Sequence, residues 1–313
     1  MVAGFKKLDC VPAAYISDIK VIPSVDRIVV SSWDGSLSLF EVVTGKLLVK
    51  LVHKWPLTCC TVSRDGRVWA GSVQGELLEA DWESERLVTN EQDAIAFDLG
   101  VSGLCSVDDY LVAGSWDGRL VVVDYLHWKV VRDWKFKEKI FSVCGSTEWI
   151  VCSLSGGKVK IVELPSWKIK DTDSGLKYQC RSCALIPNGR GFVQGSIDGR
   201  VSVEFFDAKT SKFAFRCHRM NLEDVQLVFP VTALAFQPDS LNLYTGGADG
   251  KIVSWNLVTR KKQEELPKLD DSIVKLCCTD EYLVIGTSDD SFRTCATPQD
   301  IELHDSAIYI KYL

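Results

Sequence analysis

Four basic residues occupy equivalent places along the chain, each directly after the second residue of a tight turn: Arg119, Lys158, Arg200 and Lys251. Cations repeated in this way can bind an acidic or phosphorylated peptide, and arginine can hold a phosphate or carboxylate through two parallel hydrogen bonds. The turn aspartates Asp117, Asp198 and Asp249 stand close to three of these cations and can neutralise them instead. The pattern therefore leaves two interpretations open, a basic binding surface and a set of locally balanced charges.

Two tryptophans stand at the tips of turns of the same kind, in Trp33-Asp34-Gly35 and Trp116-Asp117-Gly118. Tryptophan is among the residues that dominate binding energy at interfaces, so an exposed pair would anchor a partner. The alternative is structural, with each ring folded over the centre of the molecule or packed against a neighbouring unit. Both alternatives stay open at this point.

A basic and aromatic segment, Lys212–Arg219, adds to this set of candidate residues. Its alternation predicts a strand with Phe213, Phe215 and Cys217 on one side and Arg216 and His218 on the other. The segment that follows, Met220–Phe229, reads as a long connection, and long ordered connections often carry function. Several basic residues are therefore expected to support a binding surface around the principal ligands: Arg119, Lys158, Lys251, His218 and Arg219.

The turns themselves recur at a nearly constant interval. Their second positions are Gly35, Gly75, Gly118, Gly157, Gly199 and Gly250, with Asp290 as a degenerate seventh, and the spacings are 40, 43, 39, 42, 51 and 40 residues. Asp-Gly is a strong hairpin signal because both central residues must accept a positive φ. An interval of about 40 residues is the period of a four-stranded propeller blade. The sequence therefore predicts an all-β, seven-bladed propeller that forms a single domain over residues 1–313.

One unit shows the strands of such a blade in order, at residues 231–236, 242–246, 251–256 and from 259 onward. Most segments alternate with period two, and few show the spacing of an amphipathic helix. Closing the ring requires a last blade built from both ends of the chain. Its strands are expected at residues 272–278, 282–286 and 307–312, with the N-terminal residues 4–8 as the fourth. The segment Ser291–Pro298 then reads as an excursion between strands.

The composition excludes several classes of protein. A net charge of −6 argues against a surface that binds nucleic acid throughout, and no direct nucleic-acid contact is expected. Since the chain contains no run of about 18 apolar residues, no membrane span or membrane partner is expected. The first residues also lack a secretory signal. Many of the 12 cysteines lie inside apolar runs, so reduced, buried thiols in a cytosolic or nuclear protein are expected.

The motifs of common enzymes do not occur. A phosphate-binding loop needs a glycine five residues before its Gly-Lys pair, but the three Gly-Lys pairs have Phe40, Cys152 and Thr245 there. The segment Cys180-Arg-Ser-Cys183 has no second Cys pair to complete a zinc site. There are only four histidines and no nucleophile elbow. We therefore expect no enzyme, no catalytic residue, no metal and no cofactor, and a rigid binding platform is the function that remains.

The chain resembles a known family over whole blocks of sequence. The blocks are Tyr15-Ile-Ser-Asp-Ile-Lys20, Ser32-Trp-Asp-Gly-Ser36, Ser174-Gly-Leu-Lys-Tyr-Gln179, Ser196-Ile-Asp-Gly-Arg-Val-Ser-Val-Glu-Phe-Phe-Asp207 and Phe213-Ala-Phe-Arg-Cys-His-Arg219. The Trp-Asp pair that usually ends a WD repeat is absent from most units, and only Trp255-Asn256 approximates it. These blocks resemble the fungal form of the mitotic spindle-assembly checkpoint propeller of the Bub family (budding uninhibited by benzimidazole, third member), over essentially the full length.

The resemblance implies a non-enzymatic WD40-type adaptor found in the nucleus, at kinetochores in mitosis, and partly in the cytoplasm. Its partners would be the GLEBS motifs of a checkpoint kinase and a related checkpoint inhibitor, together with phosphorylated Met-Glu-Leu-Thr repeats of a kinetochore scaffold. A monomeric propeller within such hetero-complexes is expected. The alternative is the related messenger-RNA export propeller, which binds a nucleoporin GLEBS motif.

The resemblance also assigns residues to these partners. Trp33, Trp116 and Arg181 match the positions that bind GLEBS motifs, and Arg200 and Arg216 match the positions that bind phosphothreonine. Phosphothreonine carries about −1.5 to −2 charges at neutral pH, so two guanidinium groups can clamp it. This mechanism requires that Arg200 and Arg216 converge from neighbouring blades on one open rim.

Overall fold

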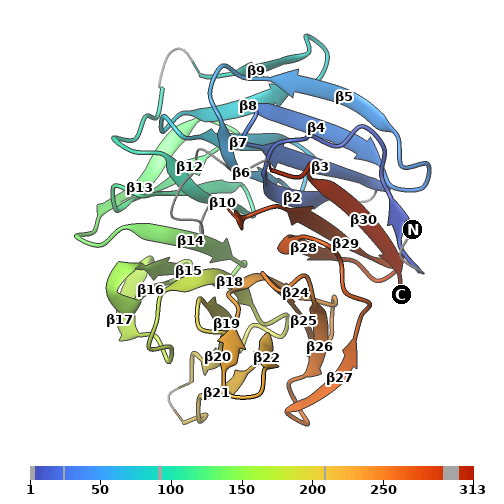
Figure 1. Ribbon diagram of the computed structural model, residues 1–313. Coiled ribbons are helices and arrows are strands. Elements are labelled where there is room, and N and C mark those ends of the chain that lie inside the picture. The colour runs from blue at the N-terminus through green and yellow to red at the C-terminus, as the bar shows by residue number, and fades with distance from the viewer. Residues whose placement is uncertain (1–3, 24, 91–93, 208, 292–302) are drawn as a thin grey trace.

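The computed structural model describes residues 4–23, 25–90, 94–207, 209–291 and 303–313. These residues form seven antiparallel sheets of four strands, arranged as blades around a central channel (Figure 1). The innermost strands of consecutive blades contact one another around the whole ring, including those of the first and last blades. The predicted seven-bladed, all-β propeller is therefore confirmed.

The first three blades follow chain order from the innermost to the outermost strand. Blade one contains β2 (Ile16–Ile22), β3 (Arg27–Ser32), β4 (Ser36–Glu41) and β5 (Leu47–Val52). Blade two contains β6 (Leu57–Val62), β7 (Val68–Ser72), β8 (Leu77–Asp81) and β9 (Arg86–Val88). Blade three contains β10 (Val101–Val107), β11 (Tyr110–Ser115), β12 (Arg119–Asp124) and β13 (Lys129–Lys135).

The next three blades repeat this order. Blade four contains β14 (Ile140–Gly145), β15 (Trp149–Leu154), β16 (Lys158–Glu163) and β17 (Lys168–Asp173), with the 3₁₀ turn η1 (Ser155–Gly157) between β15 and β16. Blade five contains β18 (Cys180–Leu185), β19 (Gly191–Ser196), β20 (Arg200–Phe205) and β21 (Phe213–Arg216). Blade six contains β24 (Val231–Phe236), β25 (Asn242–Gly247), β26 (Ile252–Asn256) and β27 (Lys261–Glu265).

Blade seven joins the two ends of the chain, as predicted. It contains β28 (Ser272–Cys278), β29 (Tyr282–Ser288), β30 (Ala307–Tyr312) and the N-terminal strand β1 (Lys6–Lys7). Lys6 pairs with Ile310 and Lys7 with Tyr309, and the amide of Leu8 donates to the Ile308 carbonyl at 2.9 Å. The expected excursion at 291–298 lies outside the described residues except for Ser291. Within the described residues no helix is long and apolar enough to cross a bilayer.

Burial across a blade follows from how the blades stack. All seven residues of β29 are buried because neighbouring blades cover both faces of the middle strands. All five residues of β27, Lys-Lys-Gln-Glu-Glu, are exposed because an outermost strand faces solvent. Apolar runs therefore mark the middle strands, and charged strands mark the rim.

Small residues in the second strand allow adjacent blades to approach closely. Five blades have a glycine at this position: Gly71, Gly114, Gly195, Gly246 and Gly286. A Cβ on Gly246 would overlap Ile273 of the next blade, and one on Gly286 would overlap Ile19 of blade one. Each glycine thus leaves a socket for a valine or isoleucine of the neighbouring inner strand, and the socket at Gly286 helps to close the ring.

The turns between second and third strands lie at the same end of the propeller as the connections between blades. The amides of six connection residues donate to the carbonyls of the turn glycines at 2.8–3.0 Å: His53, Phe97, Phe136, Ser174, Cys217 and Leu269. Since Gly35 has a φ of 82°, a side chain there would be strained as well as blocked by the His53 carbonyl. We call this end the top face.

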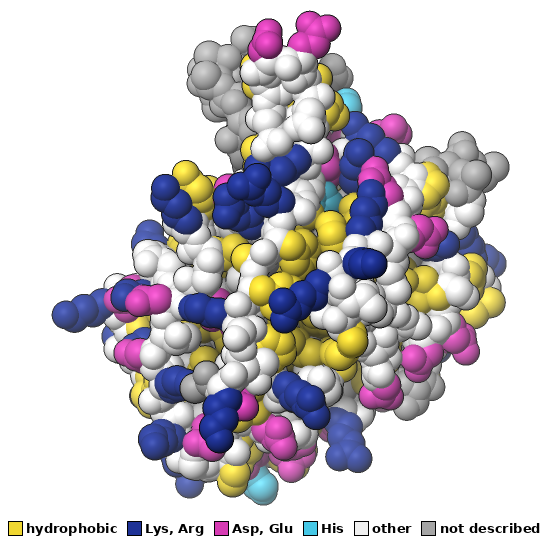
Figure 2. Space-filling view, turned by 90° about the horizontal axis from the view of Figure 1, so that it is seen from below, with side chains coloured by type: hydrophobic (Ala, Val, Ile, Leu, Met, Phe, Trp, Pro, Cys, Tyr) yellow, Lys and Arg dark blue, Asp and Glu magenta, His cyan; other side chains and the backbone are white. Residues whose placement is uncertain are grey.

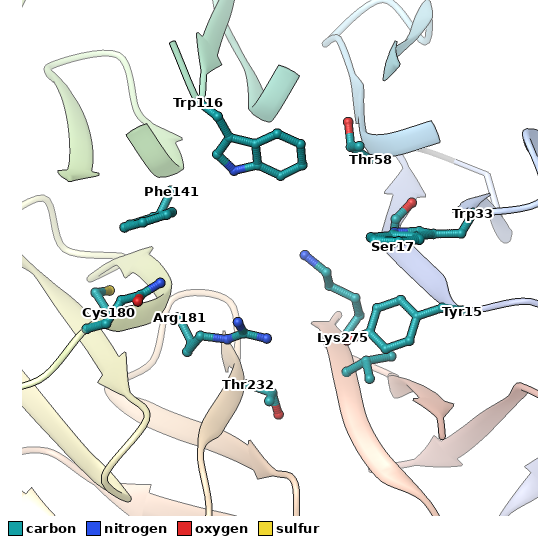
Figure 3. Close-up of a pocket in the computed structure, with 12 residues that line it drawn as sticks. Tyr15, Ser17, Trp33, Thr58, Trp116, Phe141, Cys180, Arg181, Thr232 and Lys275 are labelled. Carbon is teal, nitrogen blue, oxygen red and sulfur yellow. The ribbon is translucent and has the colours of Figure 1, made fainter. Parts of the chain in front are cut away.

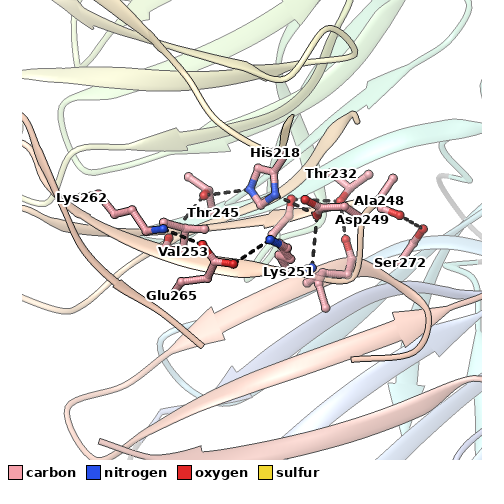
Figure 4. A network of polar contacts seen from close by, with 12 residues as sticks. His218, Thr232, Thr245, Ala248, Asp249, Lys251, Val253, Lys262, Glu265 and Ser272 are labelled. Atoms are coloured by element: carbon pink, nitrogen blue, oxygen red, sulfur yellow. Dashed lines mark hydrogen bonds and ion pairs between the residues drawn. The ribbon is translucent and has the colours of Figure 1, made fainter. Parts of the chain in front are cut away.

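Blade six contains a buried chain of hydrogen bonds between side chains (Figure 4). His218 Nδ1 lies 2.9 Å from Asp249 Oδ1, and His218 Nε2 lies 3.0 Å from Thr245 Oγ1. Trp255 Nε1 donates to Thr245 Oγ1 at 3.0 Å. All four side chains are satisfied when Thr245 donates to His218 and His218 donates to Asp249. This chain ties the entry to blade six to its turn at Asp249.

The segment between blades five and six forms an additional hairpin that the sequence did not predict. Its strands are β22 (Arg219–Asn221) and β23 (Gln226–Val228), and the residues of the turn between them are exposed. The expected long connection, Met220–Phe229, therefore contains regular structure.

Candidate functional site

Every innermost strand carries a β-bulge near its start, at the second residue in six strands and at the third in β28. The register of each inner pair shifts by one residue there. The bulged residues are Ser17, Thr58, Ser102, Phe141, Arg181, Thr232 and Val274. A bulge redirects a side chain without breaking the sheet, and bulges are frequent beside functional sites. One residue of each blade is thus redirected near the top of the channel.

The hydroxyl residues at these bulges serve the fold itself. Thr58 Oγ1 donates to the Gly71 carbonyl of its own blade at 3.0 Å and lies 2.5 Å from the Val101 carbonyl of the next. Thr232 makes the equivalent bonds to the carbonyls of Gly246 and Ile273. Phe141 and Arg181 occupy the same position without such bonds among the described residues. Their side chains extend into the channel instead (Figure 3).

A hollow of about 170 Å³ lies where the channel opens on the top face (Figure 3). All seven blades contribute to its wall, and we call it the channel mouth. Its lining residues are Tyr15, Ser17, Trp33, Thr58, Trp116, Phe141, Gln179, Cys180, Arg181, Thr232, Val274 and Lys275. The structure thus brings Trp33, Trp116 and Arg181, three residues far apart in sequence, into one site.

The two tryptophans are both packed within the fold and partly exposed, so each of the two roles considered from the sequence applies to them. Trp33 is 44% exposed and its ring meets the edge of Tyr15 at a centroid distance of 6.0 Å. Trp116 is half-buried and lies against Gly100, where a Cβ would collide with the indole. Both rings border the channel mouth, so they are fixed by packing and still present an apolar surface to a ligand.

Positive charge dominates the channel below this rim. Lys275 lines the channel mouth beside Arg181, and its Nζ lies 3.5 Å from Asp18 Oδ1. Lys20 Nζ lies 3.2 Å from Asp18 Oδ2. Burial alone would raise the pKa of Asp18, but the two ammonium groups and a backbone amide lower it below its ordinary value. One carboxylate therefore balances two lysines, while Arg181 makes no ion pair with any described residue.

Sequence reasoning missed Tyr15, Phe141 and Lys275 as parts of this site. A signal for one of them was available, because aligning the seven inner strands places Phe141 and Arg181 where four other blades have Ser or Thr. A residue without a hydroxyl at this position does not hydrogen-bond the next blade, and it is therefore a candidate for ligand binding. Tyr15 and Lys275 leave no comparable mark in the sequence.

Arg200 and Arg216 are direct neighbours across the strand pair β20–β21. The expectation that they come from neighbouring blades is wrong, because both belong to blade five. Directly opposite residues of an antiparallel pair point to the same face with Cβ atoms about 4.5–5.5 Å apart. The two guanidinium groups can therefore reach one ligand.

These two arginines differ in how they are held. Arg200 Nε lies 3.0 Å from Asp198 Oδ2, although its N–H is not aligned for a hydrogen bond. The side chain of Arg200 is still 40% exposed. Arg216 is exposed and has no ion pair within the described parts of the chain. Arg200 is thus oriented by its own turn, and Arg216 beside it is a cation without an ion-pair partner among the described residues.

Three of the four strands of blade five carry an arginine at the top end. Arg181 stands at the top of the innermost strand, Arg200 at the top of the third and Arg216 at the top of the outermost. Adjacent strands are about 4.8 Å apart, so Arg181 and Arg200 stand about 10 Å from each other. The channel mouth and the arginine pair are therefore adjacent sites on one blade. Figure 2, which faces the side lowest in Figure 1, shows Lys and Arg side chains on this side of the molecule.

Three of the expected supporting cations are already paired. Arg119 makes two hydrogen bonds to Asp133, at 3.0 and 2.8 Å. Lys158 pairs with Asp173 at 2.7 Å, and Lys251 with Glu265 at 2.7 Å. These carboxylates belong to the outermost strand of the same blade, not to the turn. The expected arc of cations is therefore corrected to a set of balanced charges. Arg200 is paired too, but with Asp198 of its own turn.

The two remaining supporting residues also have other roles. The expectation that His218 faces a ligand beside Arg216 is wrong, because β21 ends at Arg216 and His218, with a φ of 48°, turns into the core. Its side chain is fully buried in the chain of bonds to Asp249 and Thr245. Arg219 donates to the Asp198 carbonyl and to Gln226 Oε1, each at 2.8 Å, and so braces the turn that carries Arg200.

The cysteines and the acidic groups do not form a reactive centre among the described residues. All eleven cysteines among the described residues are free, and burial raises the pKa of Cys59, Cys105 and Cys180 to about 12. Such thiols stay protonated and behave as small apolar groups. Asp271, Asp289 and His304 lie close together, and His304 Nδ1 is 3.0 Å from Asp271 Oδ1. Hydrogen bonds among the three account for this grouping.

Comparison with known proteins agrees with this geometry. The model of the WD domain, G-beta repeat, matches residues 226–256, which include most of blade six. The solved structure titled "Structure of U3-55K" superposes with a TM-score of 0.85 at 18% identity, covering 99% of this chain and 98% of the other. The protein is thus a WD-repeat β-propeller with an aromatic and cationic hollow at the top of its channel.

Relatives with curated names define the family. The mitotic checkpoint protein bub-3 of Caenorhabditis elegans is 30% identical over 82% of this chain and 79% of its own length. The spindle assembly checkpoint protein bub3 of Schizosaccharomyces pombe is 27% identical over 87% of this chain and 88% of its own. The chain belongs to the Bub3 family of mitotic checkpoint proteins. The poly(A)+ RNA export protein of Schizosaccharomyces pombe is also similar, at 26% identity over 84% of this chain and 77% of its own.

Proposed function

We propose that this chain is a non-enzymatic adaptor that holds two ligands on its top face. A GLEBS motif of a checkpoint kinase or the related checkpoint inhibitor occupies the channel mouth. A phosphorylated Met-Glu-Leu-Thr repeat of a kinetochore scaffold binds Arg200 and Arg216. A single propeller in each complex thereby docks the checkpoint proteins on the scaffold, in the nucleus and at kinetochores during mitosis, with a fraction in the cytoplasm.

The channel mouth suits an acidic, partly apolar segment. Trp33 and Trp116 supply rigid apolar walls, which lose little conformational entropy on binding. Arg181 faces the same hollow from blade five and has no carboxylate partner among the described residues, so it can bind an acidic side chain of the ligand (Figure 3). Lys275 adds positive charge at the same rim.

The arginine pair suits a phosphate group. Nε of Arg200 is turned toward Asp198, which leaves its two terminal NH₂ groups for a ligand. Arg216 has no internal partner among the described residues and offers the full guanidinium. Since each hydrogen bond to a charged group contributes about 1.5–3 kcal/mol, loss of either arginine should weaken phosphopeptide binding by about tenfold to 100-fold.

The observation that carries this proposal is the register of β20 and β21, which sets Arg200 directly opposite Arg216 at an open edge. Phosphorylation adds the charge that this pair can bind, so it would switch docking on. The short distance from Arg200 to Arg181 along the same blade explains how one adaptor can hold both ligands at once.

The test is a fluorescence titration of the protein with phosphorylated and unphosphorylated Met-Glu-Leu-Thr peptides, with a GLEBS peptide present. We expect binding of the phosphorylated form only. Arg200→Ala should weaken phosphopeptide binding by about tenfold to 100-fold and spare GLEBS binding, and Arg181→Ala should weaken GLEBS binding and spare the phosphopeptide. Arg190→Ala is the matched control, because Arg190 is exposed at the opposite end of blade five. Equal loss of both ligands in Arg200→Ala would contradict the proposed division of labour.

A second candidate function is supported by the similarity to the poly(A)+ RNA export protein. In this alternative the channel mouth would bind a nucleoporin GLEBS motif, and the arginine pair would have no phosphopeptide ligand. A pull-down from mitotic extract separates the two, since recovery of a nucleoporin without the kinetochore scaffold would favour export.

A further inference from the structure

A second hollow opens on the top face beside the channel mouth. Its volume is about 550 Å³, within the range of sites that hold small ligands or several side chains. Residues from the tops of blades five, six and seven line it, and Arg181 lines both hollows. The two are therefore contiguous, and a linear segment that leaves the channel mouth past Arg181 can enter this one. We call it the aspartate groove.

One side of the aspartate groove is strongly acidic. Four aspartates line it: Asp270, Asp271, Asp289 and Asp290. The negative charges of two of them lie beside a histidine, since His304 Nδ1 is 3.0 Å from Asp271 Oδ1 and 3.9 Å from Asp289 Oδ2. Asp290 accepts a bond from Ser272 at 2.5 Å, and Asp270 is exposed and has no ion pair with a described residue. Apart from Arg181 at its end, the described residues of the lining include no cation.

The opposite side of the groove is apolar. Ile197 at the turn of blade five is 39% exposed, and Val228 at the end of β23 is 38% exposed. Phe229, Pro230 and Ala248 continue this wall toward blade six. Aliphatic side chains left exposed beside a row of carboxylates favour a ligand with both apolar and basic groups, because each wall then meets its complement.

We propose that the aspartate groove binds a short basic and aliphatic stretch of the same partner segment whose acidic side chain reaches Arg181. The proposal rests on the proposed binding of a GLEBS motif at the channel mouth and extends it. Lysine or arginine of the ligand would pair with Asp270 and Asp271, and an adjacent aliphatic side chain would cover Ile197 and Val228. The alternation of charge along the top face, positive at the mouth and negative in the groove, fixes the direction in which the segment lies.

The experiment is calorimetry with the full-length protein and a GLEBS peptide from the checkpoint kinase of the same organism. A second peptide has every lysine and arginine replaced by glutamine. The protein variant is Asp270→Asn/Asp271→Asn, which keeps the size of both side chains and removes their charge. Asp280→Asn is the matched control, since Asp280 is exposed in the same blade at the end opposite the groove.

The double variant should bind the unmodified peptide about threefold to tenfold more weakly, and the loss should shrink at high salt. It should bind the glutamine peptide no more weakly than the wild type does, because the charge pair is already absent. If the double variant binds the unmodified peptide as tightly as the wild type while Arg181→Ala loses it, the groove proposal is wrong and the channel-mouth proposal stands. If Arg181→Ala also leaves binding unchanged, the channel-mouth proposal is wrong, and the groove proposal that rests on it is wrong as well.

Discussion

His218 provides a sharp test of which basic residues belong to the fold and which to the ligand site. It lies two residues after Arg216, in a segment that sequence reasoning assigned to recognition. The structure buries its side chain completely between Asp249 and Thr245. The substitution His218→Ala should therefore lower the stability of the fold and leave phosphopeptide affinity almost unchanged at temperatures where the variant is folded.

The size of the effect follows from the groups that the substitution leaves behind. The carboxylate of Asp249, only 4% exposed, would keep one bond, from the amide of Lys251 at 3.1 Å, and lose the one from His218. Thr245 would lose one partner and keep Trp255. Each buried polar group left short of a bond costs about 1–3 kcal/mol, and the emptied volume adds to this. We expect the free energy of unfolding to fall by about 3–5 kcal/mol.

The assay is thermal and urea unfolding followed by circular dichroism, with His127→Ala as the matched control. His127 is 76% exposed, and among the described residues its side chain bonds to Asp124 of its own turn alone, so its removal should cost less than about 1 kcal/mol. The unfolding midpoint of His218→Ala should fall by roughly 6–15 °C. An unchanged midpoint together with lost phosphopeptide binding would refute the structural role argued here.

The other predictions concern charge and packing. Arg119→Ala should leave both ligands bound within about twofold by calorimetry, because its guanidinium is held by Asp133. Gly246→Ala should lower the free energy of unfolding in urea by about 1–3 kcal/mol, because the methyl group would overlap Ile273. The pKa of His304 should lie above its ordinary value of 6.5 in an NMR titration, since its hydrogen bond to Asp271 raises it. A raised folded pKa means that this contribution to stability is complete below pH 6.5 and fades as the pH rises through the folded pKa, and Asp271→Asn should lower the pKa and remove most of the effect.

Much of the fold could be predicted because the same short turn and strand sequences recur in each blade. A turn with a positive φ requires glycine, so the turns at Gly35 and Gly250 are visible without any knowledge of packing. The closing pair of β1 and β30 followed from the same repeat, since one blade lacked strands at its C-terminal end. The expected top face followed from the turns, and with it the position of Trp33 and Trp116.

The balance of charges could not be predicted in the same way. The sequence places Asp117 near Arg119, and proximity along the chain favours that pair. In the folded blade, however, Asp117 accepts bonds from the amides of Arg119 and Asp98, while the Arg119 side chain reaches Asp133 on the next strand. Cross-strand register decides such pairings, and register depends on the length of each outer turn.

The position of Arg181 shows a second limit. Simple alternation along β18 does not show that a bulge displaces this residue from the ladder, because alternation assumes an unbroken strand pair. His218 shows a third, since β21 ends at Arg216, three residues before the end of the alternating segment Lys212–Arg219, and His218 has a left-handed backbone. Both cases involve a local departure from period two at the site itself.

The glycine sockets between blades have a consequence for how variants of this protein should be interpreted. Aromatic and cationic groups contributed by separate blades hold their spacing only while valine and isoleucine stay seated one layer beneath them, at glycines such as Gly114 and Gly195. A single added methyl group in that layer would push neighbouring blades apart and separate the side chains that line the channel mouth. Loss of partner capture can therefore arise from a residue that no ligand ever touches.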